Sequence, residues 1–171
     1  MYTTDKTKYI QNKSQCKGEE IMIWGMVFPN GILTIKLLKG KIKSENYLHI
    51  VQTFAVKIMK LNMRPNFLLV QDNCSVYKTM AVQNYLRSQN INIIDWPSRS
   101  PDLNIIENLW KVMSDIVYDQ GQPRDMKDLE KRIINAADTV NICKRDIIRT
   151  LYATFRQRLT SVLISNGSRY K

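Results

Sequence analysis

Two acidic residues occupy positions from which their carboxylates could together bind a metal ion. Asp72 follows the apolar run 67–70, and Glu107 lies at the edge of the apolar stripe of a predicted helix, three residues before Trp110. Ligands of open α/β sheets gather beyond the carboxyl ends of the strands. An acid there could meet an acid on a helix that faces the sheet, and the pair could share a hard divalent cation. The alternative is structural, with Asp72 in a turn and Glu107 solvated.

Other kinds of catalytic site have little support. His49 is the only histidine, and no suitable partner lies near it in the sequence, so a Ser/His/Asp or Cys/His nucleophilic site is not expected. The chain has neither a GxxxxGK[ST] loop nor a GxGxxG loop for nucleotides. Asp102 is predicted to be structural, because Ser100 and Pro101 suit the start of a helix and an aspartate in the first turn complements the helix dipole.

The chain carries a large positive charge. Its 171 residues include 26 lysines and arginines against 15 aspartates and glutamates, a formal net charge of +11, and the pI is about 9.7. Such an excess favours a polyanionic partner, of which nucleic acid is the commonest. The candidate nucleic-acid-binding residues are Lys39, Lys41 and Lys43 after a predicted hairpin, and Arg145, Arg149 and Arg156 on a predicted C-terminal helix. Each group has a simpler alternative as a solvated charged face.

Several classes of protein are not expected. No segment approaches about 18 uninterrupted apolar residues, so no membrane span is predicted. The N-terminal residues lack the apolar region of a secretory signal. The three cysteines, Cys16, Cys74 and Cys143, are far apart and lack CxxC spacing, which argues against a disulfide framework and a zinc site. We therefore expect a reduced, intracellular protein without a membrane partner.

The order of the predicted elements indicates a mixed α/β domain. Residues 20–38 are predicted to form a hairpin around Pro29-Asn30-Gly31. The unbroken apolar run at 67–70 is typical of a central parallel strand, and a second apolar strand is predicted at 91–96. The predicted helices cover 44–62, a short stretch ending near 88, and residues 103–117, 126–140 and 148–162. Helical crossovers between parallel strands account for this order.

We expect one domain with a short lead-in. Residues 1–18 are polar and lysine-rich and are predicted to be poorly anchored, whereas residues 19–171 form the domain. With 44% apolar residues, a chain of this length can bury a proper core. Trp24, Trp96 and Trp110 each fall in an apolar run or stripe, so they are predicted to belong to that core.

Two segments of the chain contain recognisable motifs. The first is Leu69-Val70-Gln71-Asp72-Asn73, and the second contains the string Trp-Pro-x-x-Ser-Pro-Asp-Leu-Asn-x-Ile-Glu-Asn-x-Trp. Both segments closely resemble the catalytic domain of Tc/mariner-type DDE transposases. The 34 residues (73–106) between Asp72 and Glu107 match the spacing of the Tc-like branch, and the likeness runs from about residue 17 to 171. Besides the two acids, the matched motif residues are Trp24, Gly25, Asn73, Trp96, Pro97, Ser100, Pro101, Asp102, Asn104 and Trp110.

The resemblance implies an α/β, RNase H-like (retroviral-integrase-like) fold, in which helices flank a mixed sheet. It also implies the two-metal chemistry of a DDE superfamily endonuclease, with Mg²⁺ or Mn²⁺, in DNA transposition and integration. By match, Asp72 is the second residue of the catalytic, metal-binding triad and Glu107 is the third. The resemblance further implies DNA as partner, a location in the nucleus and a homodimer.

The family's first aspartate has no evident counterpart. It lies on the first strand, well before the Trp-Gly pair, whereas only 23 residues precede Trp24. The upstream acids are Asp5, Glu19 and Glu20, and none lies in a strand-like run at the right distance. We therefore expect the first strand to be missing, unless residues 7–12 fill its place in part or the chain belongs to a longer reading frame. The family's N-terminal helix-turn-helix region also has no counterpart.

Two hypotheses of function follow. In the first, the chain is a transposase DDE-domain fragment whose metal-dependent DNA cleavage and strand transfer are impaired because the first aspartate is absent. In the alternative, it is a non-catalytic nucleic-acid-binding or interaction protein derived from a transposase. An RNase H-type nuclease is a weaker third option, since it would lack the same carboxylate.

Overall fold

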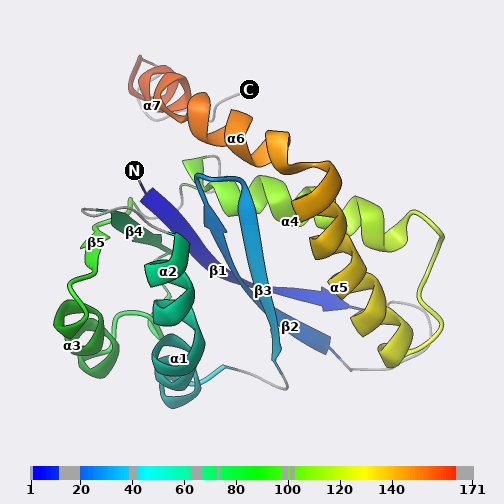
Figure 1. The fold of residues 1–171 in the computed structure, drawn as a ribbon, viewed down its shortest axis with the longest axis horizontal. Helices are drawn as coiled ribbons and strands as arrows, with labels where there is room; N and C mark the ends of the chain where they lie inside the picture. The colour runs from blue at the N-terminus through cyan, green and yellow to red at the C-terminus, as the bar shows by residue number, and fades with distance from the viewer. Residues whose placement is uncertain are drawn as a thin grey trace.

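A computed structural model describes residues 2–11, 20–38, 42–62, 67–72, 74–97, 100 and 103–164, and for residues 2–11 and 20 it describes the backbone alone. Within these ranges the chain forms one mixed sheet with helices on both faces (Figure 1). The strand order is β3-β2-β1-β4-β5. The strands are β1 (Tyr2–Gln11), β2 (Glu20–Phe28), β3 (Ile32–Leu38), β4 (Leu68–Gln71) and β5 (Asn92–Ile94).

The central strand is made by residues that were expected to be a poorly anchored lead-in. β1 pairs antiparallel with β2 and parallel with β4, so the strand predicted to be missing is present. The prediction was wrong because it sought an apolar run, whereas β1 is mostly threonine, tyrosine and lysine. Threonine, tyrosine and isoleucine nevertheless favour extended backbone, and a neighbouring strand on each side supplies hydrogen-bonding partners.

Two groups of helices cover the sheet, one on each face (Figure 1). The first group comprises α1 (Ser44–Ile50), the π-helical turn η1 (Val51–Ala55), α2 (Val56–Asn62) and α3 (Met80–Ser88). The second comprises α4 (Ile105–Tyr118), α5 (Met126–Cys143), α6 (Arg145–Ala153) and α7 (Phe155–Ile164). Within the described part of the chain, every helix is too short or too polar to traverse a lipid bilayer.

Each face of the sheet has its own core, and β2 contributes to both. Trp24 and Met26 pack in the core under α1–α3, whereas Ile23 and Val27 pack in the core under α4–α7. Successive side chains of a strand point to opposite faces, so a strand covered on both sides needs apolar residues at every position. This explains why the run 21–28 shows no polar alternation.

Two predicted helices differ in detail from those observed. The helix expected over 44–62 contains η1, whose wider turn rotates the face of the residues that follow, and the apolar side chain of Leu61 is 75% exposed. The helix expected over 148–162 is divided at Thr154, whose hydroxyl donates to the carbonyl of Thr150 (2.8 Å). The outer residues of α6 and α7 therefore do not share one continuous helix face.

Candidate active site

Asp72 lies directly after β4 and is half-buried. Its Oδ1 accepts a hydrogen bond from the backbone N–H of Cys74 (3.0 Å), which closes a turn at the strand end. The turn predicted from the sequence is therefore present. It does not compete with a binding role, because it uses one oxygen of the carboxylate and fixes the direction of the group.

Asp5 lies on the strand next to Asp72. In the parallel pairing of β1 with β4, Asp5 is in register with Gln71, the residue before Asp72. Neighbouring strands are about 4.8 Å apart, so the backbone of Asp5 lies beside the carboxyl end of β4. The expectation that no upstream acid lies in a strand at the right distance is wrong for Asp5.

Glu107 belongs to the first turn of α4 and is half-buried. Its N–H donates to the carbonyl of Asn104 (3.1 Å), the N-cap residue of the helix. The helix begins here because Asn104 has extended backbone angles and the next six residues supply the apolar side chains at Ile105, Ile106, Leu109 and Trp110. An acidic side chain in the first turn also interacts favourably with the helix dipole.

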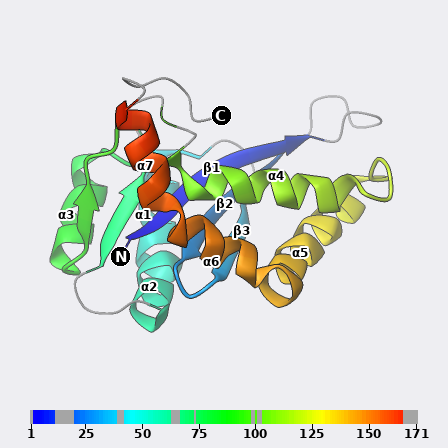
Figure 2. The ribbon, with the colours of Figure 1, turned by 90° about the horizontal axis from the view of Figure 1, so that it is seen from above.

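The first turns of α4 rest on β2. A Cβ placed on Gly25 would lie 2.5 Å from Cη2 of Trp110 and 3.3 Å from Cδ1 of Ile106, so these side chains stand directly over the glycine. Gly25 is in register with Lys6 of β1. Glu107, the residue after Ile106, therefore lies in the first turn of a helix that packs over β1 and β2, as Figure 2 shows from above.

The three acidic residues come from three elements. Asp5 lies beside the end of β4 and Asp72 follows that end, whereas Glu107 lies in the first turn of α4, whose Ile106 and Trp110 stand over Gly25 of β2. The side chains of Asp72 and Glu107 are described, whereas Asp5 is placed by its backbone. Among the described side chains no group of three or more histidines, cysteines, aspartates or glutamates could hold a metal ion.

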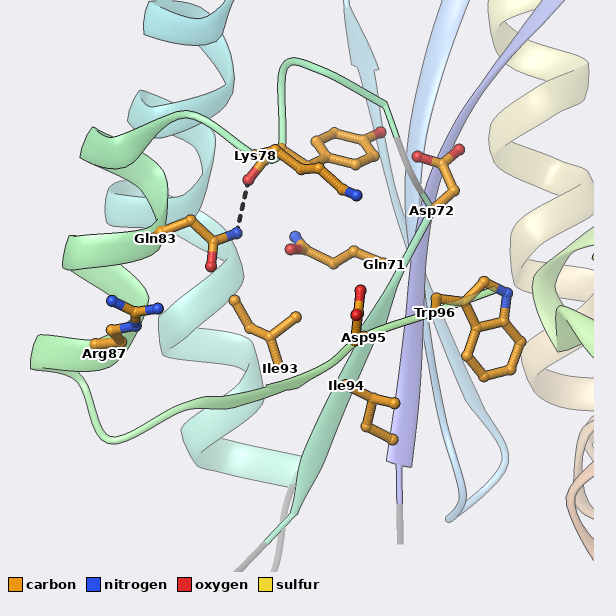
Figure 3. Close-up of a pocket in the computed structure, with 10 residues that line it drawn as sticks. Gln71, Asp72, Lys78, Gln83, Arg87, Ile93, Ile94, Asp95 and Trp96 are labelled. Carbon is orange, nitrogen blue, oxygen red and sulfur yellow. Dashed lines mark hydrogen bonds between the residues drawn. The ribbon is translucent and has the colours of Figure 1, made fainter. Parts of the chain in front are cut away.

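A pocket of about 390 Å³ opens beside Asp72 (Figure 3). Its walls come from the ends of β4 and β5 and from α3 with the residues before it. Sequence reasoning missed Asp95, Lys78 and Arg87, which line this pocket. Asp95 follows β5 as Asp72 follows β4. The same expectation, that ligands gather beyond the carboxyl ends of the strands, could therefore have identified Asp95. Nothing in the sequence distinguishes Lys78 and Arg87 from other surface cations.

Residues 1–130 match the family model of the DDE superfamily endonucleases. The match covers most of the chain and includes all five described strands and the helices α1 to α4. This chain belongs to the DDE superfamily endonucleases. The sequence motifs resemble those of Tc/mariner-type transposases. Similar transposases and solved transposase structures confirm this resemblance.

Two transposases of Caenorhabditis elegans show this relationship. The chain is 28% identical to the Tc3 transposase over 152 residues, which cover 88% of this chain and 45% of that protein. It is 28% identical to the Tc1 transposase over 94 residues, which cover 55% of this chain and 34% of that protein. The chain therefore spans less than half the length of these relatives.

Solved structures of the Mos1 mariner transposase share the fold. The Mos1 catalytic domain matches with a TM-score of 0.82 and 13% identity, over 99% of this chain and 84% of that one. A Mos1 paired-end complex with the left transposon end matches with a TM-score of 0.81 and 13% identity, over 99% and 56%. The RNase H-like α/β fold is thereby confirmed. Structures of the Mos1 catalytic domain with Mn and with Mg are also similar.

The motif residues of this DDE superfamily chain have mainly structural positions. Trp24 and Trp110 are fully buried, one in each core, and Trp96 is half-buried with its ring stacked 6.3 Å from that of Phe155. Asn104 is buried at the start of α4, Ser100 is half-buried and Pro97 is exposed. Asn73, Pro101 and Asp102 lie outside the described residues.

The candidate nucleic-acid-binding residues are dispersed. Arg145 and Arg149 are exposed on α6 and Arg156 is exposed on α7, and Arg149 forms an ion pair with Asp146 (3.1 Å). Lys43 is exposed at the N-cap of α1, whereas Lys39 and Lys41 lie outside the described residues. The residues with described side chains are thus accessible to a polyanion, and the ion pair lowers the free charge of α6.

Proposed function

We propose that this chain performs the metal-dependent cleavage and transfer of DNA strands, with Asp5, Asp72 and Glu107 as its three carboxylates. The observation that carries the proposal is the register of β1, which sets Asp5 beside Gln71 and next to Asp72. The third acid comes from α4, which Trp110 holds against the sheet. Three carboxylates from two adjacent strands and one helix suit a site for hard cations.

The donor set fits Mg²⁺ or Mn²⁺. Both ions prefer carboxylate oxygens, and histidine or cysteine ligands, which would favour softer metals, are not part of the set. When bound, two such ions stabilise the attacking and leaving oxygens of an in-line displacement at a phosphodiester. Mn and Mg are also named in solved structures of the Mos1 catalytic domain, which has the same fold.

The chain's own residues supply the positioning. The turn from Asp72 to the Cys74 N–H orients one carboxylate toward the strand end. The contact of Trp110 with Gly25 fixes the height of Glu107 above the sheet. Asp5 lies on the central strand, which is hydrogen-bonded on both sides and is therefore the most constrained of the three elements.

DNA is the proposed substrate and partner. The net charge of +11 provides a sequence-independent attraction to phosphates, with Arg145, Arg149 and Arg156 and the lysines 39, 41 and 43 as proposed contacts. We propose that the protein acts on DNA in the nucleus. A Mos1 transposase structure is a paired-end complex, and we propose that this chain acts as a homodimer.

The alternative, a non-catalytic binding protein, depended on the absence of the first strand and its aspartate. Since residues 2–11 form the central strand, that argument no longer favours it. The catalytic proposal therefore stands alone.

Nicking of supercoiled plasmid DNA in Mg²⁺ or Mn²⁺ tests this function. Wild-type protein should nick, and Asp5→Asn, Asp72→Asn and Glu107→Gln should each lower the rate by about a hundredfold or more, since each removes several kcal/mol of transition-state stabilisation. Asp138→Asn, at an exposed aspartate of α5, is the matched control and should nick as wild type. Equal nicking by wild type and Asp5→Asn would contradict the proposed triad.

A further inference from the structure

The pocket beside Asp72 contains polar groups that a carboxylate site for metal ions does not need. Lys78, Gln83 and Arg87 line it from the α3 side, and Asp95 lines it from the end of β5. In Figure 3 the side chains of Gln71 and Asp95 point into the space between these two walls. The pocket therefore has a cationic wall and a wall of hydrogen-bonding groups, and it adjoins the candidate active site.

The cationic wall is suited to more than one phosphate. Gln83 and Arg87 are four residues apart on α3 and share a helix face, while Lys78 precedes the helix. A helix rises 1.5 Å per residue, so the nine residues of α3 separate its two ends by roughly 13 Å. A charge-assisted contact to phosphate spans only about 3 Å, so the two cations suit different phosphates of one strand.

The opposite wall disfavours phosphates and favours bases. Asp95 is acidic, and an anionic backbone would be repelled from that side. A carboxylate or an amide can instead pair with the polar edge of a base. The amide of Gln71 on this wall is held in place, because its Nε2 donates to the hydroxyl of Tyr47.

The volume limits the kind of ligand. A pocket of about 390 Å³ lies within the range of small-molecule sites, roughly 300–1,000 Å³. A DNA duplex does not fit such a space, whereas an unpaired nucleotide does. The ligand must also combine phosphates with hydrogen-bonding bases. Free phosphate could bind the cationic wall, but it has no base to pair with the opposite wall.

We propose that this pocket binds unpaired DNA nucleotides next to the phosphodiester at Asp72, with Lys78 and Arg87 on the phosphates and Gln71 and Asp95 facing the bases. The proposal rests on the proposed function, since it assumes that the DNA strand bound in the pocket is the strand that is cut. In this arrangement, the DNA nucleotides that follow the reacting phosphate lie on the side of the site formed by β5 and α3.

Binding of two fluorescent hairpin DNAs to the full chain tests this proposal. One hairpin is blunt and the other carries a single-stranded overhang of three nucleotides, and both are titrated in EDTA so that metal ions play no part. Wild-type protein should bind the overhang hairpin roughly tenfold more tightly, because the overhang adds phosphate and base contacts.

Two double variants with equal loss of charge separate the pocket from general attraction. Lys78→Ala with Arg87→Ala should abolish the preference for the overhang and reduce the salt slope of log K for that probe by about 1.4, which corresponds to two single-strand phosphate contacts. Lys127→Ala with Lys131→Ala, at exposed positions of α5, should weaken binding of both hairpins alike and keep the preference. Circular dichroism melts verify that both variants fold.

An equal affinity of wild type for both hairpins would overturn the proposal, as would a preference that survives in the Lys78/Arg87 variant. If that double variant does not fold, the single variants decide, and each should lose part of the preference. These outcomes are separable from failure of the proposed function, because the overhang preference is measured without metal ions and nicking is measured with them.

Discussion

The indole of Trp110 occupies the space that a side chain at Gly25 would need. Cη2 and Cζ2 of the indole lie 2.5 Å and 2.7 Å from the position of a Cβ on that glycine. The contact joins α4 to β2, and β2 pairs with the strand that carries Asp5. A packing contact between a glycine and a tryptophan thereby sets the position of Glu107 relative to the other two acids.

The first prediction concerns this contact. Gly25→Ala should destabilise the protein by about 1–3 kcal/mol, because the buried indole must move away from the new methyl group. It should also slow metal-dependent nicking, because α4 carries Glu107. Urea denaturation and the plasmid assay measure the two effects.

A second substitution serves as the control for Gly25→Ala. Trp110→Phe shortens the ring, and the indole Nε1 has no hydrogen-bond partner among the described residues, so the change removes packing alone. In the double variant, part of the stability lost through Gly25→Ala should return. A Gly25→Ala protein as stable as wild type would contradict the close contact.

The second prediction concerns the exposed edge of the sheet. The side-chain amide of Asn141 on α5 accepts from the N–H of Leu33 and donates to its carbonyl, both at 2.8 Å, and so takes the place of a neighbouring strand at β3. Asn141→Ala leaves both backbone groups without this partner and should cost about 1–3 kcal/mol.

Chemical denaturation of Asn141→Ala and of Asn135→Ala measures that cost. Asn135 is an exposed residue of the same helix, and its replacement should change the free energy of unfolding by about 0.5 kcal/mol or less. If the two variants were equally stable, the amide bridge to β3 would have no energetic role.

The third prediction concerns pH. The backbone N–H of Arg124 (2.9 Å) and the guanidinium of Arg132 (3.1 Å) bond to the carboxylate of Asp128 and lower its pKa. Because the folded-state pKa lies below the unfolded value of about 3.9, this stabilisation is present above that pH and is lost as the pH falls through the folded-state pKa. Asp128→Asn should therefore destabilise the protein at pH 7 and approach wild type in acid.

Unfolding free energies at pH 7 and near pH 3 test the sign. Arg132→Gln is the companion variant: it keeps the bond from Arg124 but also removes the bonds from Arg132 to the carbonyls of Val117 and Gly121, so part of its difference from wild type should persist in acid. A stability difference between Asp128→Asn and wild type that does not shrink in acid would contradict the assignment.

Some of the site was predictable because its elements have strong local signals. Asp72 follows an apolar strand, and Glu107 lies on a helix with a continuous apolar stripe, so both elements were found. The site's first strand was not, because β1 lacks an apolar run and is defined by pairing with residues far along the chain, such as Gln71. Propensity and periodicity carry little information about such long-range pairing.

The same limit applies to details within helices. The prediction of one helix over 44–62 assumed a regular helical period, and the π-helical turn at 51–55 breaks that period, so Leu61 is exposed. Lys78 and Arg87 could not be singled out, since only the folded chain shows that they line one pocket with Asp72.

The central claim is that Asp5 completes a carboxylate set with Asp72 and Glu107. Titration of the protein with Mn²⁺, followed by electron paramagnetic resonance, tests it without any need for DNA or turnover. Asp5→Asn should weaken Mn²⁺ binding by about tenfold or more, as much as Asp72→Asn does, because each removes one anionic ligand. Wild-type Mn²⁺ affinity in Asp5→Asn, with weakened affinity in Asp72→Asn, would contradict it.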